Sequence, residues 1–145
     1  SANKVPKWFL ETIGVWVSLL NDCRYCVDHH YQGLVHLLGD DDRARAIRAA
    51  LDSQDTDNGP FENKEKAALR YAKVLTRAPF AASEVMVAEL RDLGYEDGEI
   101  LEINQVSAYF NYANRTVMGL GCSTRGDILG LSPNQSDDPD NWTHS

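Results

Sequence analysis

Two cysteines and a histidine lie close together near the start of the chain. Cys23 and Cys26 form a C-x-x-C pair, and His30 follows Cys26 by four residues. If one helix carries them, their side chains share a face, and the imidazole can accept a thiol proton directly or through a water. The first turn of a helix, where backbone N–H groups are unpaired, also favours a thiolate. The spacing therefore predicts a dithiol redox site.

A glutamate further upstream can join this group if the chain folds back on itself. Glu11 stands within an apolar stretch, and the midpoint between Glu11 and His30 lies close to Asn21-Asp22. Asn or Asp at that point can interrupt one helix and cap the next. In an antiparallel helix hairpin, Glu11 and His30 would lie level, and the carboxylate would orient the imidazole. We therefore predict a proton relay of thiol, imidazole and carboxylate.

The same residues also allow other interpretations. A C-x-x-C pair can be half of a zinc site, which needs four ligands, and Cys122, His29 or His30 could complete it. The pair can also be chemically inert. Tyr25, between the cysteines, is interpreted first as a packing residue, although its hydroxyl could hydrogen-bond a thiolate or a relay water. Asp28 and His29 are expected to point to other faces of the helix and to stay outside the relay.

The elements that must position these residues are helices. Apolar residues recur at three- and four-residue spacing over residues 8–20, and a second helix, ending near Gly39, carries the redox motif from its first turn. Further helices are expected over about residues 40–51, 63–77, 83–94 and 97–121, with a loop at residues 52–60. No convincing strand pattern appears. The sequence thus predicts an all-α fold of about six helices.

Length and composition limit the function further. A chain of 145 residues makes one domain the default, and 43% hydrophobic with 25% charged residues is ordinary for a soluble globular protein. The net charge of −8, without a block of Lys and Arg, argues against nucleic-acid and anionic-membrane partners. The apolar run at residues 8–20 is too short to span a bilayer and lacks a signal-peptide cleavage site. A cytoplasmic location is therefore expected.

The third cysteine and the C-terminal segment fall outside the redox motif. Three cysteines is an odd number, whereas disulfide-stapled secreted domains usually have an even one. Cys122 is interpreted as a small buried side chain near the end of the last helix. We expect residues 1–122 to form the helical domain and residues 123–145 to form a polar tail. This tail either docks on a surface, such as that of a neighbouring subunit, or is a frayed terminus.

A set of residues in this order resembles the signature of the AhpD-like alkylhydroperoxidases, within the carboxymuconolactone decarboxylase family: Glu11, Cys23, Tyr25, Cys26 and His30. Asn114-Arg115 and the segment Leu-Gly-Leu-Ser-Pro at residues 129–133 are similar to the peroxidase-related branch of that family. The resemblance spans most of the chain. It implies an AhpD-like all-helical bundle with the redox motif at the start of a core helix, and assembly into a homo-oligomer.

The resemblance also implies roles for the individual residues. Cys26 would be the thiolate that attacks a peroxide, and Cys23 would be the resolving thiol. His30 and Glu11 would form the proton relay, with Tyr25 in the position of an auxiliary relay residue. The implied function is a thiol-dependent peroxidase that reduces organic hydroperoxides or hydrogen peroxide and is restored by an external dithiol or protein reductant. No metal, flavin or nucleotide cofactor is implied, and the glycines form no phosphate-binding loop.

Two other functions would use the same cysteines. The chain could be a disulfide reductase or adaptor for a partner peroxidase, or a non-enzymatic helical module that senses redox state. Relatives that act as lactone decarboxylases generally lack the paired cysteines, so that activity is not expected. Family members usually carry a longer helical segment before the relay glutamate, whereas ten residues precede Glu11 here.

Overall fold

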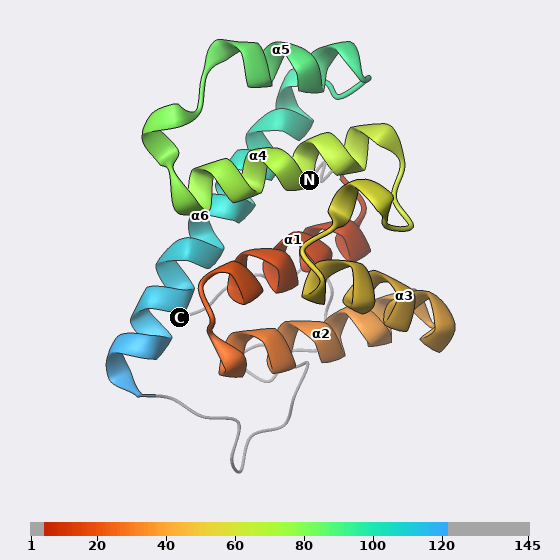
Figure 1. Ribbon diagram of the computed structural model, residues 1–145, viewed down its shortest axis with the longest axis vertical. Coiled ribbons are helices and arrows are strands. Elements are labelled where there is room, and N and C mark those ends of the chain that lie inside the picture. The colour runs from red at the N-terminus through yellow and green to blue at the C-terminus, as the bar shows by residue number, and fades with distance from the viewer. Residues whose placement is uncertain (1–4, 122–145) are drawn as a thin grey trace.

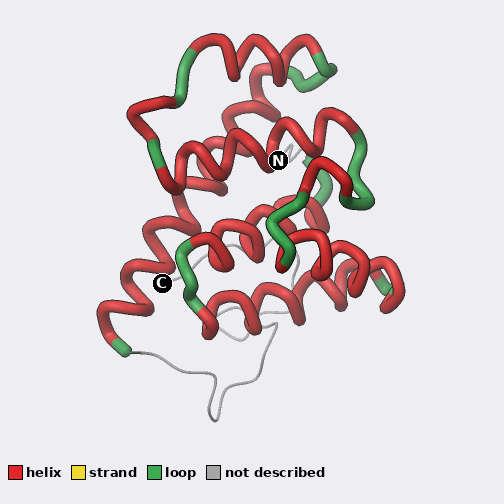
Figure 2. Tube along the Cα trace, in the orientation of Figure 1, coloured by secondary structure: helices red, strands yellow, loops and turns green. Residues whose placement is uncertain are grey.

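The computed structural model describes residues 5–121. These residues form six α-helices: α1 Lys7–Leu20, α2 Arg24–Leu38, α3 Asp41–Asp52, α4 Asn63–Arg77, α5 Glu84–Asp92 and α6 Asp97–Leu120. Two short 3-10 helices, η1 Thr56–Asn58 and η2 Pro79–Ala81, lie in the connections (Figures 1 and 2). The predicted all-α fold of about six helices is confirmed, and η1 lies within the stretch expected as a loop. Cys122 and the predicted tail at 123–145 lie outside the described residues.

Local sequence signals account for the helix ends. The Asp40 side chain caps α3 by accepting a hydrogen bond from the Arg43 N–H at 3.1 Å. Capping boxes begin α4 and α6. Gly39 ends α2 and Gly121 ends α6, both in the left-handed conformation that glycine adopts without steric cost. These starts and stops therefore follow from residues beside each helix.

The helix α1 is the centre of the bundle. It contacts α2, α3, α4 and α6, and every residue from 9 to 18 except Glu11 is buried. In Figure 1, α2 runs back beside α1, with α4 on the other side of α1. A helix covered on all sides is apolar all round, which explains the run of apolar residues in this segment. Glu11 is therefore a carboxylate held within a core helix.

A short turn joins α1 to α2 and places the first cysteine. Asp22 adopts a left-handed conformation with φ of 55°, and the Cys23 N–H donates to the Ser18 carbonyl at 2.9 Å. Cys23 is the N-cap of α2, and the helix begins at Arg24. The expectation that Asn21 or Asp22 caps this helix, with Cys23 inside its first turn, is therefore wrong, because the turn extends to the cysteine itself.

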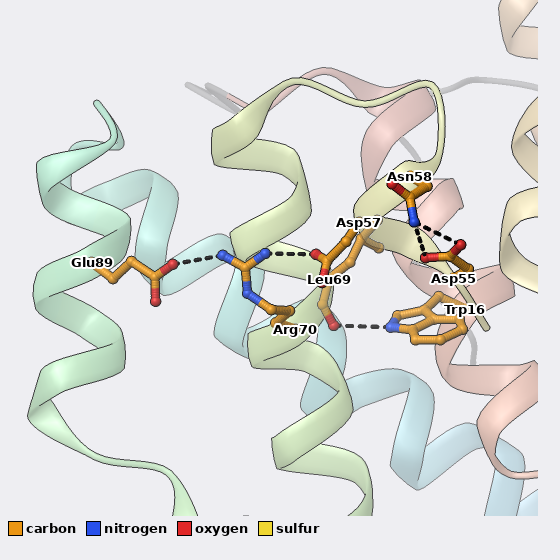
Figure 3. Close-up of polar contacts among 7 residues, drawn as sticks. All are labelled: Trp16, Asp55, Asp57, Asn58, Leu69, Arg70 and Glu89. Carbon is orange, nitrogen blue, oxygen red and sulfur yellow. Dashed lines mark hydrogen bonds and ion pairs between the residues drawn. The ribbon is translucent and has the colours of Figure 1, made fainter.

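Two neighbouring residues of α4 connect this helix to other elements, one by a buried contact and the other by contacts on the surface. The buried Trp16 indole N–H of α1 donates to the Leu69 carbonyl at 2.9 Å. Arg70 bridges Asp57 of η1 at 2.8 Å and Glu89 of α5 at 2.6 Å (Figure 3). The inner contact is shielded from water, whereas all three side chains of the outer contacts are more than 40% exposed.

The helix α6 extends along the long axis of the molecule, from α5 to beyond the turn between α1 and α2 (Figure 1). Its buried face carries residues at three- and four-residue spacing: Ile100, Ile103, Ser107, Phe110 and Asn114. Two of these residues are polar, so the stripe that packs on the core is not purely apolar. No helix within residues 5–121 has both the length and the apolar character needed to cross a membrane.

Candidate redox site

A disulfide joins Cys23 and Cys26 at the N-terminus of α2. Their Cα atoms lie 5.3 Å apart, and the two residues are only 2% and 3% exposed. Cys23 is the N-cap and Cys26 lies in the first turn, among backbone N–H groups that have no acceptor within the helix. The partial positive charge of this helix end favours a thiolate once the disulfide is reduced.

His30 lies about one turn after Cys26 and is bonded to Glu11 on α1. The distance from His30 Nδ1 to Glu11 Oε2 is 2.9 Å, and the two side chains are 11% and 14% exposed. Because an ionised carboxylate only accepts hydrogen bonds, Nδ1 carries the proton and Nε2 is left as the basic nitrogen. The hairpin thus brings together the two residues that lie equally far from its turn.

Gly33 of α2 faces the Glu11 carboxylate. Gly33 follows His30 by three residues, and a Cβ added at this position would lie 3.4 Å from Glu11 Oε1. This is an ordinary van der Waals distance, so the space between Gly33 and the carboxylate would accept a methyl group. The low exposure of the Glu11 and His30 side chains, 14% and 11%, is what limits the access of water to the bond between them.

Three further aromatic rings lie in a row with His30. Tyr25 is partly exposed and stacks on His29, with ring centroids 6.1 Å apart and planes at 4°. His29 meets His30 edge-on at 5.1 Å, and Phe110 of α6 meets His30 edge-on at 4.6 Å. Consecutive residues of a helix diverge by about 100°. The side chains of His29 and His30 are therefore expected to point to different faces of α2. Their rings nevertheless make edge-on contact, which the expectation for His29 did not include.

A buried polar network ties the turn between α1 and α2 to α6. Asn114 Nδ2 donates to Ser18 Oγ at 3.0 Å, and Asn114 Oδ1 accepts from Asn21 Nδ2 at 2.9 Å. Asn21 Nδ2 also donates to Asn111 Oδ1 at 2.9 Å. The carbonyl of the same Ser18 accepts the Cys23 N–H at 2.9 Å. Ser18 therefore connects α6 to the N-cap cysteine, a connection that the sequence motif does not contain.

A zinc site at the C-x-x-C pair would need two further ligands. Within residues 5–121, no group of three or more His, Cys, Asp or Glu side chains is arranged to hold a metal ion. Cys122, one of the possible further ligands, lies outside the described residues. The arrangement around α2 is that of a disulfide beside an imidazole–carboxylate pair.

Two solved structures are similar to this chain. An uncharacterized peroxidase-related protein from Silicibacter sp. TM1040 is 27% identical, with a TM-score of 0.75 over 84% of this chain. An uncharacterized peroxidase-related protein from Ralstonia eutropha JMP134, described as an alkylhydroperoxidase AhpD core, is 23% identical, with a TM-score of 0.71 over 82% of this chain. The chain spans 61% and 60% of the length of these two proteins.

The two similarities above are to solved structures. No protein-family model matches the sequence, and no curated protein matches it. The helical arrangement is nevertheless the one found in the two solved structures. The predicted resemblance to AhpD-like, peroxidase-related proteins is therefore confirmed at the level of the fold.

Proposed function

We propose that this chain is a thiol-dependent peroxidase in which Cys26 attacks the substrate and Cys23 resolves the product. One observation carries the proposal: a Cys23–Cys26 disulfide at a helix N-terminus, with the His30–Glu11 pair about one turn away. The likeness to peroxidase-related structures supports the same class of chemistry. The roles of the residues are those implied by the sequence motif.

The first step oxidises Cys26. His30 Nε2 takes the thiol proton, directly or through a water, while Glu11 holds Nδ1. The Cys26 sulfur then attacks the O–O bond of a hydroperoxide, so that an S–O bond forms and the O–O bond breaks. The leaving oxygen takes a proton and departs as an alcohol, or as water when the substrate is hydrogen peroxide. Cys26 is left as a sulfenic acid.

The second step forms the disulfide. The Cys23 sulfur attacks the sulfenic sulfur of Cys26, an S–S bond forms, and the hydroxyl leaves as water after it takes a proton. An external dithiol or a reduced protein then supplies two electrons and two protons by thiol–disulfide exchange. The identity of this reductant, the homo-oligomer and the cytoplasmic location remain predictions.

Burial of the cysteines supports a small peroxide as the substrate rather than a protein disulfide. Both residues are at most 3% exposed. Exchange with a protein disulfide requires a sulfur of the partner to reach the attacking sulfur in line, which a buried pair impedes. A small peroxide needs much less space to reach the Cys26 sulfur. Burial therefore argues against a protein disulfide as the substrate and, for the same reason, favours a small dithiol over a reduced protein as the reductant.

Cysteine variants test the proposal in assays with hydrogen peroxide and cumene hydroperoxide, with dithiothreitol as reductant. Cys26→Ser should abolish peroxide consumption, and Cys23→Ser, first reduced and then freed of dithiothreitol, should allow one oxidation event per site before turnover stops. Cys122→Ser is the matched control and should behave as the unchanged chain. Multiple turnover by Cys26→Ser would overturn the proposal, and reduction of insulin disulfides without peroxide consumption would favour the reductase.

A further inference from the structure

A phenylalanine from the last described helix lies against the imidazole of the proposed relay. Phe110 is 0% exposed, and its ring centroid is 4.6 Å from that of His30, with the planes at 86°. An edge-to-face arrangement at this distance is a favourable one for aromatic rings. Phe110 comes from α6, whereas His30 lies on α2, so the contact exists only in the folded chain.

Gly14 of α1 determines where the Phe110 ring lies. A Cβ added to Gly14 would lie 2.5 Å from Cζ of Phe110, and 2.7 and 2.9 Å from its two Cε atoms. Any side chain at position 14 would therefore displace the tip of the ring. Gly14 follows Glu11 by three residues, so one face of α1 carries both the carboxylate and the space for the phenyl ring. Glycine weakens a helix interior, and here its missing side chain provides this space.

His30 is thus restrained from several sides. Glu11 of α1 binds Nδ1, His29 of α2 lies edge-on at 5.1 Å, and α6 contributes the Phe110 ring. Rotation of the imidazole would break the bond to Glu11 or drive the ring into that of Phe110. The basic Nε2 is therefore held in one direction. A general base needs a fixed direction, because it acts only within hydrogen-bond reach of the proton or of a bridging water.

We propose that Phe110 is a positioning residue of the redox site: wedged between Gly14 and His30, it fixes the direction of His30 Nε2 and so the rate at which Cys26 becomes reactive. The inference rests on the proposed function only in taking His30 as the base for Cys26. Phe110 acts through His30. The titratable groups near the imidazole are Glu11 and His29, with Tyr25 stacked on the latter.

The test follows the alkylation of Cys26 by iodoacetamide in the reduced full chain between pH 5 and 10, with mass-spectrometric readout of each cysteine. Phe110→Leu should slow alkylation at pH 7 by about tenfold, because a misplaced imidazole stabilises the thiolate less and a smaller fraction of Cys26 is then ionised. Its rate profile should also move to higher pH. Phe61→Leu removes another buried ring, 8% exposed, and is the matched control. It should keep the original profile, since a loss of stability alone does not move it.

A second variant and a measurement on the unchanged chain complete the test. Gly14→Ala keeps the phenyl ring but displaces it, and should move the profile in the same direction as Phe110→Leu. In the unchanged chain, ¹⁵N-histidine NMR should show His30 as a single Nδ1–H tautomer near neutral pH. An unchanged Cys26 profile in a folded variant, or exchange of His30 between tautomers, would overturn the proposal.

Failure of the proposed function can be told apart from failure of this inference. Peroxide consumption by the unchanged chain is measured in the same preparation. If peroxide is not consumed but Phe110→Leu still moves the Cys26 profile, the peroxidase proposal fails and the positioning role stands. If peroxide is consumed and the profile does not move, the reverse holds.

Discussion

Two polar networks connect helices that are distant in the sequence, and they differ in burial. One joins the turn between α1 and α2 to α6 through Ser18 and Asn114, both 0% exposed. The other joins α4 to η1 and α5 through Arg70, Asp57 and Glu89, whose side chains are 42%, 62% and 45% exposed (Figure 3). The first lies beside the cysteines, and the second lies on the surface away from them.

From this difference in burial, we expect that the charge of a contact is a poor guide to how much it stabilises the fold. A buried polar group that loses its partner costs about 1–3 kcal/mol, because water cannot replace the partner. An exposed ion pair contributes roughly 0–1 kcal/mol, since water and salt compete for both charges. The neutral network at Asn114 should therefore stabilise the fold more than the ionic network at Arg70. The following predictions test this comparison.

The largest effect is expected for Asn114→Ala. The substitution removes the partner of Ser18 Oγ, which is buried, and one of the two acceptors of the half-buried Asn21 amide. The free energy of unfolding should fall by about 2–3 kcal/mol, as measured by urea titration. Gln105→Ala, at an exposed position of the same helix, is the control and should change it by less than about 0.5 kcal/mol. Equal losses for the two variants would contradict the comparison.

A pH titration tests the partly buried Tyr109 of α6. Burial, with a smaller contribution from a charge on Tyr112, raises the pKa of Tyr109 to about 12. Because the folded pKa lies above the unfolded value of about 10, the stabilisation is complete below pH 10 and is lost as the pH rises towards 12. The loss should reach roughly 1 kcal/mol at pH 11 after allowance for partial exposure.

Tyr109→Phe should reduce the slope of stability against pH in this range, as measured by urea titration at pH 9, 10 and 11. Tyr112→Phe is the control, because Tyr112 is 68% exposed and should change the slope much less. A steeper slope in Tyr109→Phe than in the unchanged chain would contradict the argument.

A smaller effect is expected for Arg70→Gln. Loss of both ion pairs should lower the free energy of unfolding by less than about 1 kcal/mol, because all three side chains are exposed. The difference should shrink in 1 M NaCl, where charges are screened, whereas the loss in Asn114→Ala should persist. Urea titration with and without salt provides the measurement. If the free energy of unfolding fell by more than about 2 kcal/mol regardless of salt, the Arg70 network would stabilise the fold as strongly as the buried Asn114 network, against the expectation.

The smallest effect is expected for Gly33→Ala. The added Cβ would meet Glu11 Oε1 at 3.4 Å, an ordinary contact distance. Alanine also restricts the unfolded chain and favours a helix by about 0.5–1 kcal/mol. The melting temperature should therefore stay level or rise by a few degrees. A clear fall in the melting temperature would show that the Glu11 carboxylate needs the space in front of Gly33. The Glu11–His30 pair would then belong with the buried contacts in this comparison.

The helices and the Glu11–His30 contact could be predicted because both depend on local information. Periodicity and end-capping glycines such as Gly39 determine where helices lie, and a hairpin pairs residues equally far from its turn. Cys23 as the N-cap could not be predicted, because cysteine is not among the preferred capping residues and its neighbours are. The burial of Asn114 could not be predicted either, since an amide interrupts the apolar stripe that identifies a buried face.

The contribution of α6 to the site depends on packing between distant segments. Phe110 is one of the helically spaced apolar residues of the last predicted helix, and nothing in the motif indicates that it meets His30. Gly14 likewise gives no signal in the sequence, because its importance lies in the ring that occupies its space. The sequence pattern therefore predicts which residues react, whereas the tertiary fold determines which residues hold them.

The distance between α6 and the cysteines along the chain has a consequence for biosynthesis. The α1–α2 hairpin leaves the ribosome before α6 has been made, since synthesis proceeds from the N-terminus. A nascent hairpin holds both cysteines and His30 without the ring of Phe110 or the amide of Asn114. We therefore expect Cys26 of the hairpin to react more slowly than in the folded chain until α6 docks. Its reactivity would then report that this helix has reached its place in the bundle.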